Sequence, residues 1–309
     1  MSKKIDLLVP VYNGRPYFEA LLSDIKKSEH HFARIIFYDD ASQDGSAEYL
    51  SGRGLEVICG KENQGQAFAR KALLAAASAE YVHFHDMDDP LFESFFDRLA
   101  PQLQPSQIGV GRFVADFDRY SIEHHLPPSL DQGILSLEDA YHYFIHLNSV
   151  IFPREELLAV GGFRPELRIH EDRFLFFCLA NAKIHWQVCK EALARQWCHP
   201  KNTSSTMGER RIGVNWIRYF ELAFELVPAG DLGFLFRDAL RISQDLLYAG
   251  ELDMAKRGFA LCDRLGAKNF PELTPKTRWF TEQFGFYRAY HSRRIYGAGL
   301  GLVRALTNR

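Results

Sequence analysis

Three aspartates within four positions, Asp86-Met87-Asp88-Asp89, are the residues of this 309-residue chain whose types and spacing point most directly to chemistry. They follow the apolar run Tyr81-Val82-His83-Phe84 and precede Pro90. Ionised carboxylates this close together repel one another, and a cation bound among them offsets this electrostatic repulsion. A hard divalent ion held by one or two carboxylates takes its other ligands from water and substrate phosphates. The cluster therefore predicts a metal–diphosphate site, with a solvated acidic turn after a strand as the alternative.

The segments around the cluster must form the elements that position it. Apolar runs predict strands, and apolar residues at helical spacing predict helices. The predicted strands are Ile5–Val11, Arg34–Tyr38, Leu55–Cys59 and Tyr81–His85, and the predicted helices are Tyr17–Lys27, Ser46–Leu50 and Gln66–Ala79. This alternation is typical of a parallel sheet with helices on both faces, in which ligands bind beyond the carboxyl ends of the strands. Tyr12-Asn13, Asp39-Asp40 and the aspartate cluster follow three of these strands and should meet in one crevice.

Five motifs, in order along the chain, resemble those of family-2 glycosyltransferases with the GT-A fold. They are Val9-Pro10-Val11-Tyr12-Asn13-Gly14, Asp39-Asp40-Ala41-Ser42-Gln43-Asp44-Gly45-Ser46, Asn63-Gln64-Gly65 with Ala69-Arg70, Asp86-Met87-Asp88-Asp89, and Gly161-Gly162-Phe163 followed by Glu171-Asp172. The resemblance covers roughly residues 4–205 and implies an α/β fold with a Rossmann-like, mostly parallel sheet flanked by helices. The expected catalytic domain is 1–207, with a nucleotide-sugar part at about 1–110 and an acceptor part at about 111–207.

The resemblance also implies a donor site for a nucleotide-diphospho-sugar. Its expected residues are Pro10, Tyr12, Asn13, Asp39, Asn63, Gly65, Arg70, Asp86 and Met87. Asp39 is expected to accept a hydrogen bond from the nucleotide base, for which a uracil N–H is a suitable donor, whereas Asp44 is expected to cap the following helix. For Arg70 the sequence leaves three partners open, namely a donor phosphate, Asp39 or Asp86.

Asp88 is the expected direct ligand of the metal, Mn²⁺ or Mg²⁺, and Asp86 is expected to reach the ribose or a metal-bound water. Such an ion bridges both phosphates and offsets the charge on the leaving nucleoside diphosphate. His199 is a further metal candidate, because Trp197-Cys198-His199-Pro200 resembles a family segment whose histidine completes the metal or diphosphate site. Trp197 stands where the family often has arginine, which puts a phosphate role of Arg195 in doubt. A capping or packing histidine is the alternative for His199.

Glu171 and Asp172 open a predicted apolar helix, Arg173 to Ala180. Carboxylates at a helix start are explained by the helix dipole alone. The resemblance implies more, because the second acid of this pair is the general base of an inverting transfer and takes the proton from the acceptor hydroxyl. Asp172 is therefore the expected base, and Glu171 is expected to orient it or to bind the acceptor.

Composition agrees with a globular enzyme. The chain is 47% hydrophobic, and its net charge of −2 gives no general attraction to nucleic acid. Lys3-Lys4 run straight into a short strand, so no signal peptide is expected, and no apolar run reaches the roughly 18 residues of a membrane span. The five cysteines have no metal or disulfide spacing, which predicts reduced thiols in a cytoplasmic protein.

Residues 208–309 are predicted to form a helical appendage that packs on the catalytic domain, forms a homodimer interface or builds an acceptor lid. Its helices are predicted at Val214–Leu226, Gly233–Tyr248, Leu252–Leu265 and Lys276–Tyr287. The end, 284–309, carries five arginines and several aromatic residues but no Asp or Glu. Such a stretch can contact an anionic membrane surface, here the inner face of the cytoplasmic membrane. The alternative is a terminal helix packed on the protein.

Together these features predict a metal-dependent, inverting glycosyltransferase that uses a UDP-sugar or another nucleotide-diphospho-sugar. The expected acceptor is a hydroxyl of a glycan or lipid-linked glycan in bacterial cell-surface polysaccharide synthesis. A nucleotidyltransferase-like enzyme is one rival, but Asn13-Gly14-Arg15-Pro16 is a poor version of the Gly-rich, basic phosphate loop it would need. A catalytically silent glycan-binding or scaffold protein with the same fold is the other, and the intact Asp86, Asp88 and Asp172 argue against it.

Overall fold

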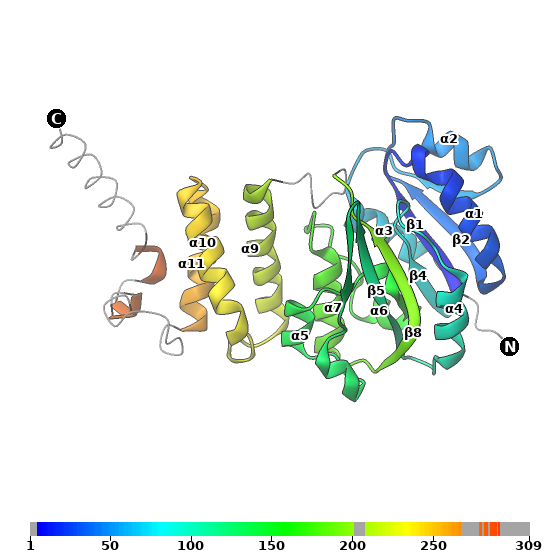
Figure 1. Cartoon of the computed structure of the whole chain (residues 1–309). Helices are drawn as coiled ribbons and strands as arrows, with labels where there is room; N and C mark the ends of the chain where they lie inside the picture. The colour runs from blue at the N-terminus through cyan, green and yellow to red at the C-terminus, as the bar shows by residue number, and fades with distance from the viewer. Residues whose placement is uncertain are drawn as a thin grey trace. The chain divides into compact units, whose positions relative to one another are not determined.

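The computed structural model describes residues 5–200 and 208–266, together with scattered positions between 278 and 290 (Figure 1). The chain divides into two compact units, Met1–Thr206 and Met207–Arg309. Each unit has its own secondary structure, so each is described by itself.

The first unit contains, within its described residues, an eight-stranded mixed sheet with the order β3-β2-β1-β4-β7-β5-β6, and β8 pairs with β5. Its strands are β1 (Ile5–Val11), β2 (Phe32–Asp39), β3 (Glu56–Cys59), β4 (Tyr81–Phe84), β5 (Ile108–Phe117), β6 (Tyr120–His124), β7 (Val150–Pro153) and β8 (Trp186–Trp197). β3, β2, β1 and β4 run parallel. β7 runs antiparallel to both β4 and β5 and joins the parallel half to the second half of the sheet.

Helices cover both faces of this sheet (Figure 1). They are α1 (Phe18–Ser28), α2 (Ser46–Ser51), α3 (Gln66–Ala76), α4 (Glu93–Leu99), α5 (Leu137–His142), α6 (Arg154–Ala159) and α7 (Glu171–Asn181). Successive residues of a strand point to opposite faces, and β1 divides its side chains accordingly. Leu8 joins a core with α3 and α7, whereas Leu7 and Val9 join a second core with α1 and α4. The predicted α/β fold with a mostly parallel sheet is confirmed.

The predicted end of the third helix, Ala79, is wrong. α3 ends at Ala76, because Ala77 has an extended backbone. The backbone N–H groups of Ser78 and Ala79 donate instead to the buried carboxylate of Asp6, at 2.7 and 2.9 Å. Asp6 therefore replaces the last helical hydrogen bonds and ties the start of β4 to β1.

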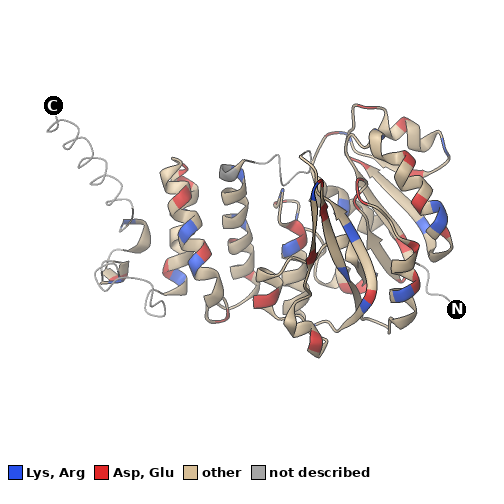
Figure 2. Cartoon of the chain, in the orientation of Figure 1, with Lys and Arg blue, Asp and Glu red and all other residues tan. Residues whose placement is uncertain are grey.

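The second unit contains three long described helices, α9 (Glu209–Leu226), α10 (Phe236–Tyr248) and α11 (Leu252–Leu265), close to three of the predicted spans. α10 and α11 pack closely at Gly258, where a Cβ would collide with the Ser243 side chain of α10. Exposed charges of both signs lie on α10, where Arg241 pairs with Asp238 at 3.2 Å and with Asp245 at 3.5 Å (Figure 2). The described residues within the helix predicted at Lys276–Tyr287 are helical, whereas most of the basic stretch 284–309 lies outside the described residues.

The structure also bears on the state of the cysteines and on membrane-spanning helices. All five thiols are free, as the reduced state requires. In the part of the chain that the structure describes, no helix combines the length and apolar character needed to span a membrane.

Candidate active site

The aspartate cluster lies just beyond the end of β4 and is held by side chains from three other segments. The Asp86 carboxylate accepts a hydrogen bond from Arg70 of α3 at 2.6 Å, and the Asp86 N–H donates to the Asn148 side chain at 3.1 Å. Asp88 Oδ2 lies 3.0 Å from His199 Nε2. Asp86 and Asp88 are partly buried and Asp89 is buried, so the cluster is not a solvated acidic turn.

Asp88 and His199 meet although 111 positions separate them in the sequence. Burial and the charge of Asp86 raise the pKa of Asp88, while the contact with His199 lowers it. Two partly buried carboxylates that repel each other, faced by an imidazole nitrogen, form a donor set that a divalent cation would stabilise. Asp88 and His199 therefore fit a metal ion together, whereas Asp86 forms a second close group of possible metal ligands with Asp89 and His146, whose ligand atoms lie within 4.8 Å of one another.

Asp89 fixes the relation between the cluster and the end of β8. Its Oδ1 accepts the backbone N–H of Trp197 at 2.6 Å, and its Oδ2 accepts the side-chain N–H of Asn148 at 2.7 Å. Burial and the neighbouring charges of Asp86 and Asp88 raise the pKa of Asp89 well above its usual range. These bonds hold the segment that carries His199 against the segment that carries Asp88.

His146 and Asn148 belong to this site, and the sequence analysis did not assign them to it. His146 Nε2 lies 3.9 Å from Asp86 Oδ2 and 3.7 Å from Asp89 Oδ2. Both lie in the segment before β7, outside the five motifs, so no motif marks them.

Arg70 joins the two halves of the site. It is 2% exposed and forms ion pairs with Asp86 and with Glu171, which opens α7. Of the two side chains left open by the sequence as partners, Arg70 contacts Asp86, and it also contacts Glu171. A donor phosphate as a further partner of Arg70 stays a prediction. Burial raises the pKa of Glu171, and the Arg70 guanidinium opposes that rise.

Asp172 occupies the first turn of α7 beside this ion-pair network. It is partly exposed, and its charge acts on both Arg70 and His146. His170, just before the helix, has a left-handed backbone with φ of 66° and makes the sharp turn into α7. Asp172 Oδ1 also accepts the N–H of Arg173 at 2.7 Å. The carboxylate at the helix start is therefore the one whose charge acts on Arg70 and His146.

The predicted base-recognition residue, Asp39, ends β2 in a buried position. Its Oδ1 accepts the N–H of Ser42 at 2.8 Å, while its Oδ2 is buried and has no hydrogen-bond partner among the described residues. Pro10 on β1 pairs with Tyr38 in the register of the sheet, and Tyr12 follows β1 with 46% of its surface exposed. An unpartnered buried carboxylate oxygen beside an exposed aromatic residue could receive an N–H of a ligand.

The loops around Asp39 are organised by side-chain hydrogen bonds. Asn13, with φ of 52°, donates its backbone N–H to Ser42 Oγ and accepts the Gln43 N–H on its side chain. Asp40 accepts the N–H groups of Gln64 and Gly65 at 2.9 and 2.7 Å. This holds the loop of Asn63 and Gly65 against the end of β2.

Two further residues connect these loops to their surroundings. Asp44 accepts the N–H of Ser46 at 3.1 Å, but the N-cap residue of α2 is Gly45, so Asp44 lies one position before the expected cap. Met87 lies against Gly14, where a Cβ would collide with the Met87 sulfur. The base-side loops and the aspartate cluster therefore lie side by side at one edge of the sheet.

Comparisons with known proteins agree with this arrangement. Residues 6–154 match the model of glycosyl transferase family 2. The chain is 31% identical over 229 residues to TuaG of Bacillus subtilis, a glycosyltransferase named for teichuronic acid biosynthesis, and the match covers 71% of this chain and 88% of TuaG. It is 30% identical over 96 residues to the processive diacylglycerol beta-glycosyltransferase of Mycoplasma genitalium, which is 29% of this chain and only 28% of that enzyme.

Two solved structures share the fold. TarS of S. aureus, in complex with UDP-GlcNAc, has a TM-score of 0.57 over 90% of this chain and 79% of that chain, at 17% identity. PcManGT of Pyrobaculum calidifontis, a mannosyltransferase in complex with GDP-Man and Mn²⁺, has a TM-score of 0.55 over 95% of this chain and 87% of that chain, also at 17% identity. The extent and identity of the match to TuaG go beyond fold, and the chain belongs to glycosyl transferase family 2 and is a glycosyltransferase.

Proposed function

We propose that this glycosyltransferase is metal-dependent and inverting, and that it moves a sugar from a UDP-sugar to a hydroxyl of a glycan or lipid-linked acceptor. The observation that carries the proposal is the contact of Asp88 with His199 beyond the carboxyl end of β4, together with Arg70, on which the charges of both Asp86 and Asp172 act. Neither a nucleotide-free scaffold nor a simple helix cap needs this arrangement.

We assign the recognition of the donor's nucleobase to Asp39. A buried carboxylate oxygen without a hydrogen-bond donor is costly, and an N–H on the edge of a nucleobase would satisfy it. Uracil offers one such N–H. The two structural neighbours are complexes with UDP-GlcNAc and with GDP-Man, and nucleotide titration distinguishes uracil from guanine.

The metal is assigned to Asp86, Asp88 and His199. Carboxylate oxygens favour Mg²⁺ or Mn²⁺, and Mn²⁺ is the ion named with PcManGT. When bound, the ion would offset the negative charge that develops on the leaving nucleoside diphosphate. Asp89 and Asn148 hold the two ligand-bearing segments in register.

The general base is assigned to Asp172. Its carboxylate takes the proton of the acceptor hydroxyl while that oxygen bonds to the anomeric carbon and the bond to the diphosphate breaks, which inverts the configuration. Arg70 and Glu171 hold the start of α7, and with it Asp172, at a fixed place relative to Asp86.

The name of TuaG supports a role in bacterial cell-surface polysaccharide synthesis. We propose that the reaction takes place in the cytoplasm, where nucleotide-sugars are made, at or near the inner face of the membrane. Peripheral membrane contact through 284–309 and a homodimer through the helical unit belong to the same proposal.

Calorimetric titration of UDP, GDP, CDP and dTDP, each with and without Mn²⁺, tests the donor and metal assignments. We expect one nucleotide to bind in a Mn²⁺-dependent manner, and Asp88→Asn to abolish the Mn²⁺ dependence while the protein stays folded. Binding that is unaffected by Asp88→Asn would remove the metal assignment. Failure of folded wild-type protein to bind any nucleotide would favour the silent scaffold.

Asp39→Asn is expected to weaken UDP binding by about tenfold to a hundredfold, without lowering the melting temperature. The asparagine oxygen can keep the hydrogen bond from Ser42, but its NH₂ group would then face the N–H of the base, and two donors cannot pair. The dissociation constant of UDP measures the effect. An unchanged constant would place the base elsewhere.

A further inference from the structure

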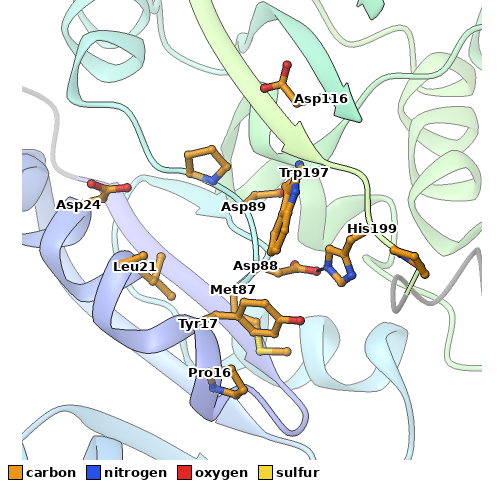
Figure 3. A pocket seen from close by; sticks show the side chains of 13 residues that line it. Pro16, Tyr17, Leu21, Asp24, Met87, Asp88, Asp89, Asp116, Trp197 and His199 are labelled. Atoms are coloured by element: carbon orange, nitrogen blue, oxygen red, sulfur yellow. Dashed lines mark hydrogen bonds and ion pairs between the residues drawn. The ribbon is translucent and has the colours of Figure 1, made fainter. Parts of the chain in front are cut away.

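A groove of about 730 Å³ lies beside the metal candidates, and its lining includes Met87 but not Tyr12 or Asp39. One wall is α1, with Leu21 and Asp24, and Tyr17 lies just before that helix. The other wall is the end of β8, with Trp197 (Figure 3). Asp88 and His199 belong to the same lining. The volume falls within the range of about 300–1,000 Å³ that is usual for small-molecule sites. The groove is therefore large enough for a ligand that reaches the metal site from the side of α1.

Trp197 gives the groove an exposed aromatic surface. The residue is 42% exposed, and its ring centroid lies 4.6 Å from that of His199 and 6.2 Å from that of Tyr17. Its backbone is fixed by the hydrogen bond to the buried Asp89. A large aromatic side chain that is exposed and held in place can bind an apolar face of a ligand without first losing conformational freedom.

Trp197 is also the position at which this chain departs from the family motif, where arginine is frequent. The nearest arginine, Arg195, forms a two-pronged ion pair with Asp116 at 2.7 and 2.9 Å. The departure therefore replaces a cation by an aromatic ring next to the metal candidates, which favours an uncharged ligand over a phosphate at this spot.

Carboxylates define the polar part of the groove. Asp24 is partly exposed, with one oxygen 2.7 Å from Lys27 Nζ, and Asp88 and Asp116 lie on the lining as well. An ionised carboxylate only accepts hydrogen bonds, so the groove suits a ligand with hydroxyl donors and repels an anion. An alkyl chain could cover the aromatic ring but could not donate to Asp24. A pyranose ring offers both a face of C–H groups and a rim of hydroxyls.

We propose that this groove binds a sugar unit of the acceptor, with a pyranose face stacked on Trp197 and a hydroxyl donating to Asp24. The assignment of that sugar to the acceptor rests on the proposed function above. The groove then adds a binding subsite between α1 and the end of β8, which belongs to the predicted acceptor part at 111–207.

The test uses the full chain labelled with 5-fluorotryptophan and followed by ¹⁹F NMR without nucleotide. The chain has four tryptophans, and Trp197→Phe identifies the signal of Trp197 by its loss. The probes are methyl glycosides of glucose, galactose, mannose and N-acetylglucosamine, with hexanol as an apolar probe and inorganic phosphate as an anionic one. We expect at least one glycoside to shift the Trp197 signal saturably, with no comparable shift from hexanol or phosphate.

Asp24→Asn supplies the second part of the test and is expected to weaken glycoside binding about tenfold. Lys27→Met is the matched control, because it breaks the same ion pair but keeps the carboxylate, and it should leave glycoside binding unchanged. A Trp197 signal that no glycoside shifts, or that hexanol shifts equally, would overturn the inference. Mn²⁺-dependent UDP binding in that same preparation would show that the proposed function stands while the subsite does not.

Discussion

Asp172→Asn is expected to lower the rate of sugar transfer by about 10²–10⁴-fold and to leave UDP binding unchanged. Asparagine has the size of aspartate and can still accept the N–H of Arg173, so the start of α7 is preserved. It cannot take a proton from the acceptor hydroxyl. The rate is measured as UDP release from a UDP-sugar, with water as the acceptor if no glycan is supplied, and binding is measured by calorimetry.

The helix-cap alternative makes the opposite prediction for the same variant. A carboxylate that only interacts with the helix dipole is worth about 0.3–1 kcal/mol, so its loss would lower the melting temperature slightly and leave the rate unchanged. Glu138→Gln is the matched control, because Glu138 is an exposed acid in the first turn of α5. It should reduce neither the rate nor UDP binding. A full rate in Asp172→Asn would assign the base to another residue.

The strands that carry the site could be predicted because each is a short apolar run that ends at polar residues. β1, from Ile5 to Val11, has the predicted bounds, and all its residues are buried. The end of α3 could not be predicted, because Ala77 to Ala79 keep the helical composition and only the distant Asp6 draws their N–H groups away. Helix propensity is a weak prior, and tertiary contacts override it.

Some residues of the candidate site could likewise be predicted from the sequence, and others could not. The aspartate cluster was visible from its spacing, and the likeness to a known family pointed to His199 and Asp172. The contact between Asp88 and His199 joins positions too far apart for any spacing rule. Asn148 was missed for a related reason, since its two hydrogen bonds to the cluster follow from the antiparallel placement of β7 beside β4 and from no local pattern.

Arg70→Met is expected to destabilise the first unit by about 3–5 kcal/mol, because it leaves Asp86 and Glu171 without their cation in a buried setting. For a unit of this size the melting temperature should fall by roughly 10 °C, measured by circular dichroism. Arg112→Met is the matched control, since the Arg112–Glu123 pair is largely exposed and such pairs contribute about 0–1 kcal/mol. Equal melting temperatures for Arg70→Met and wild type would mean that the network adds nothing to stability.

A second substitution separates the charge of Arg70 from its packing. Arg70→Met combined with Glu171→Gln removes one of the two stranded carboxylates, so the double variant should be more stable than the sum of the two single changes predicts. Arg70→Lys should fall between Met and wild type, because one ammonium cannot bridge two carboxylates as a guanidinium does. Additive losses in the double variant would show that Arg70 and Glu171 act independently. Coupled losses would mean that the aspartate cluster and the start of α7 are held together by this one buried side chain.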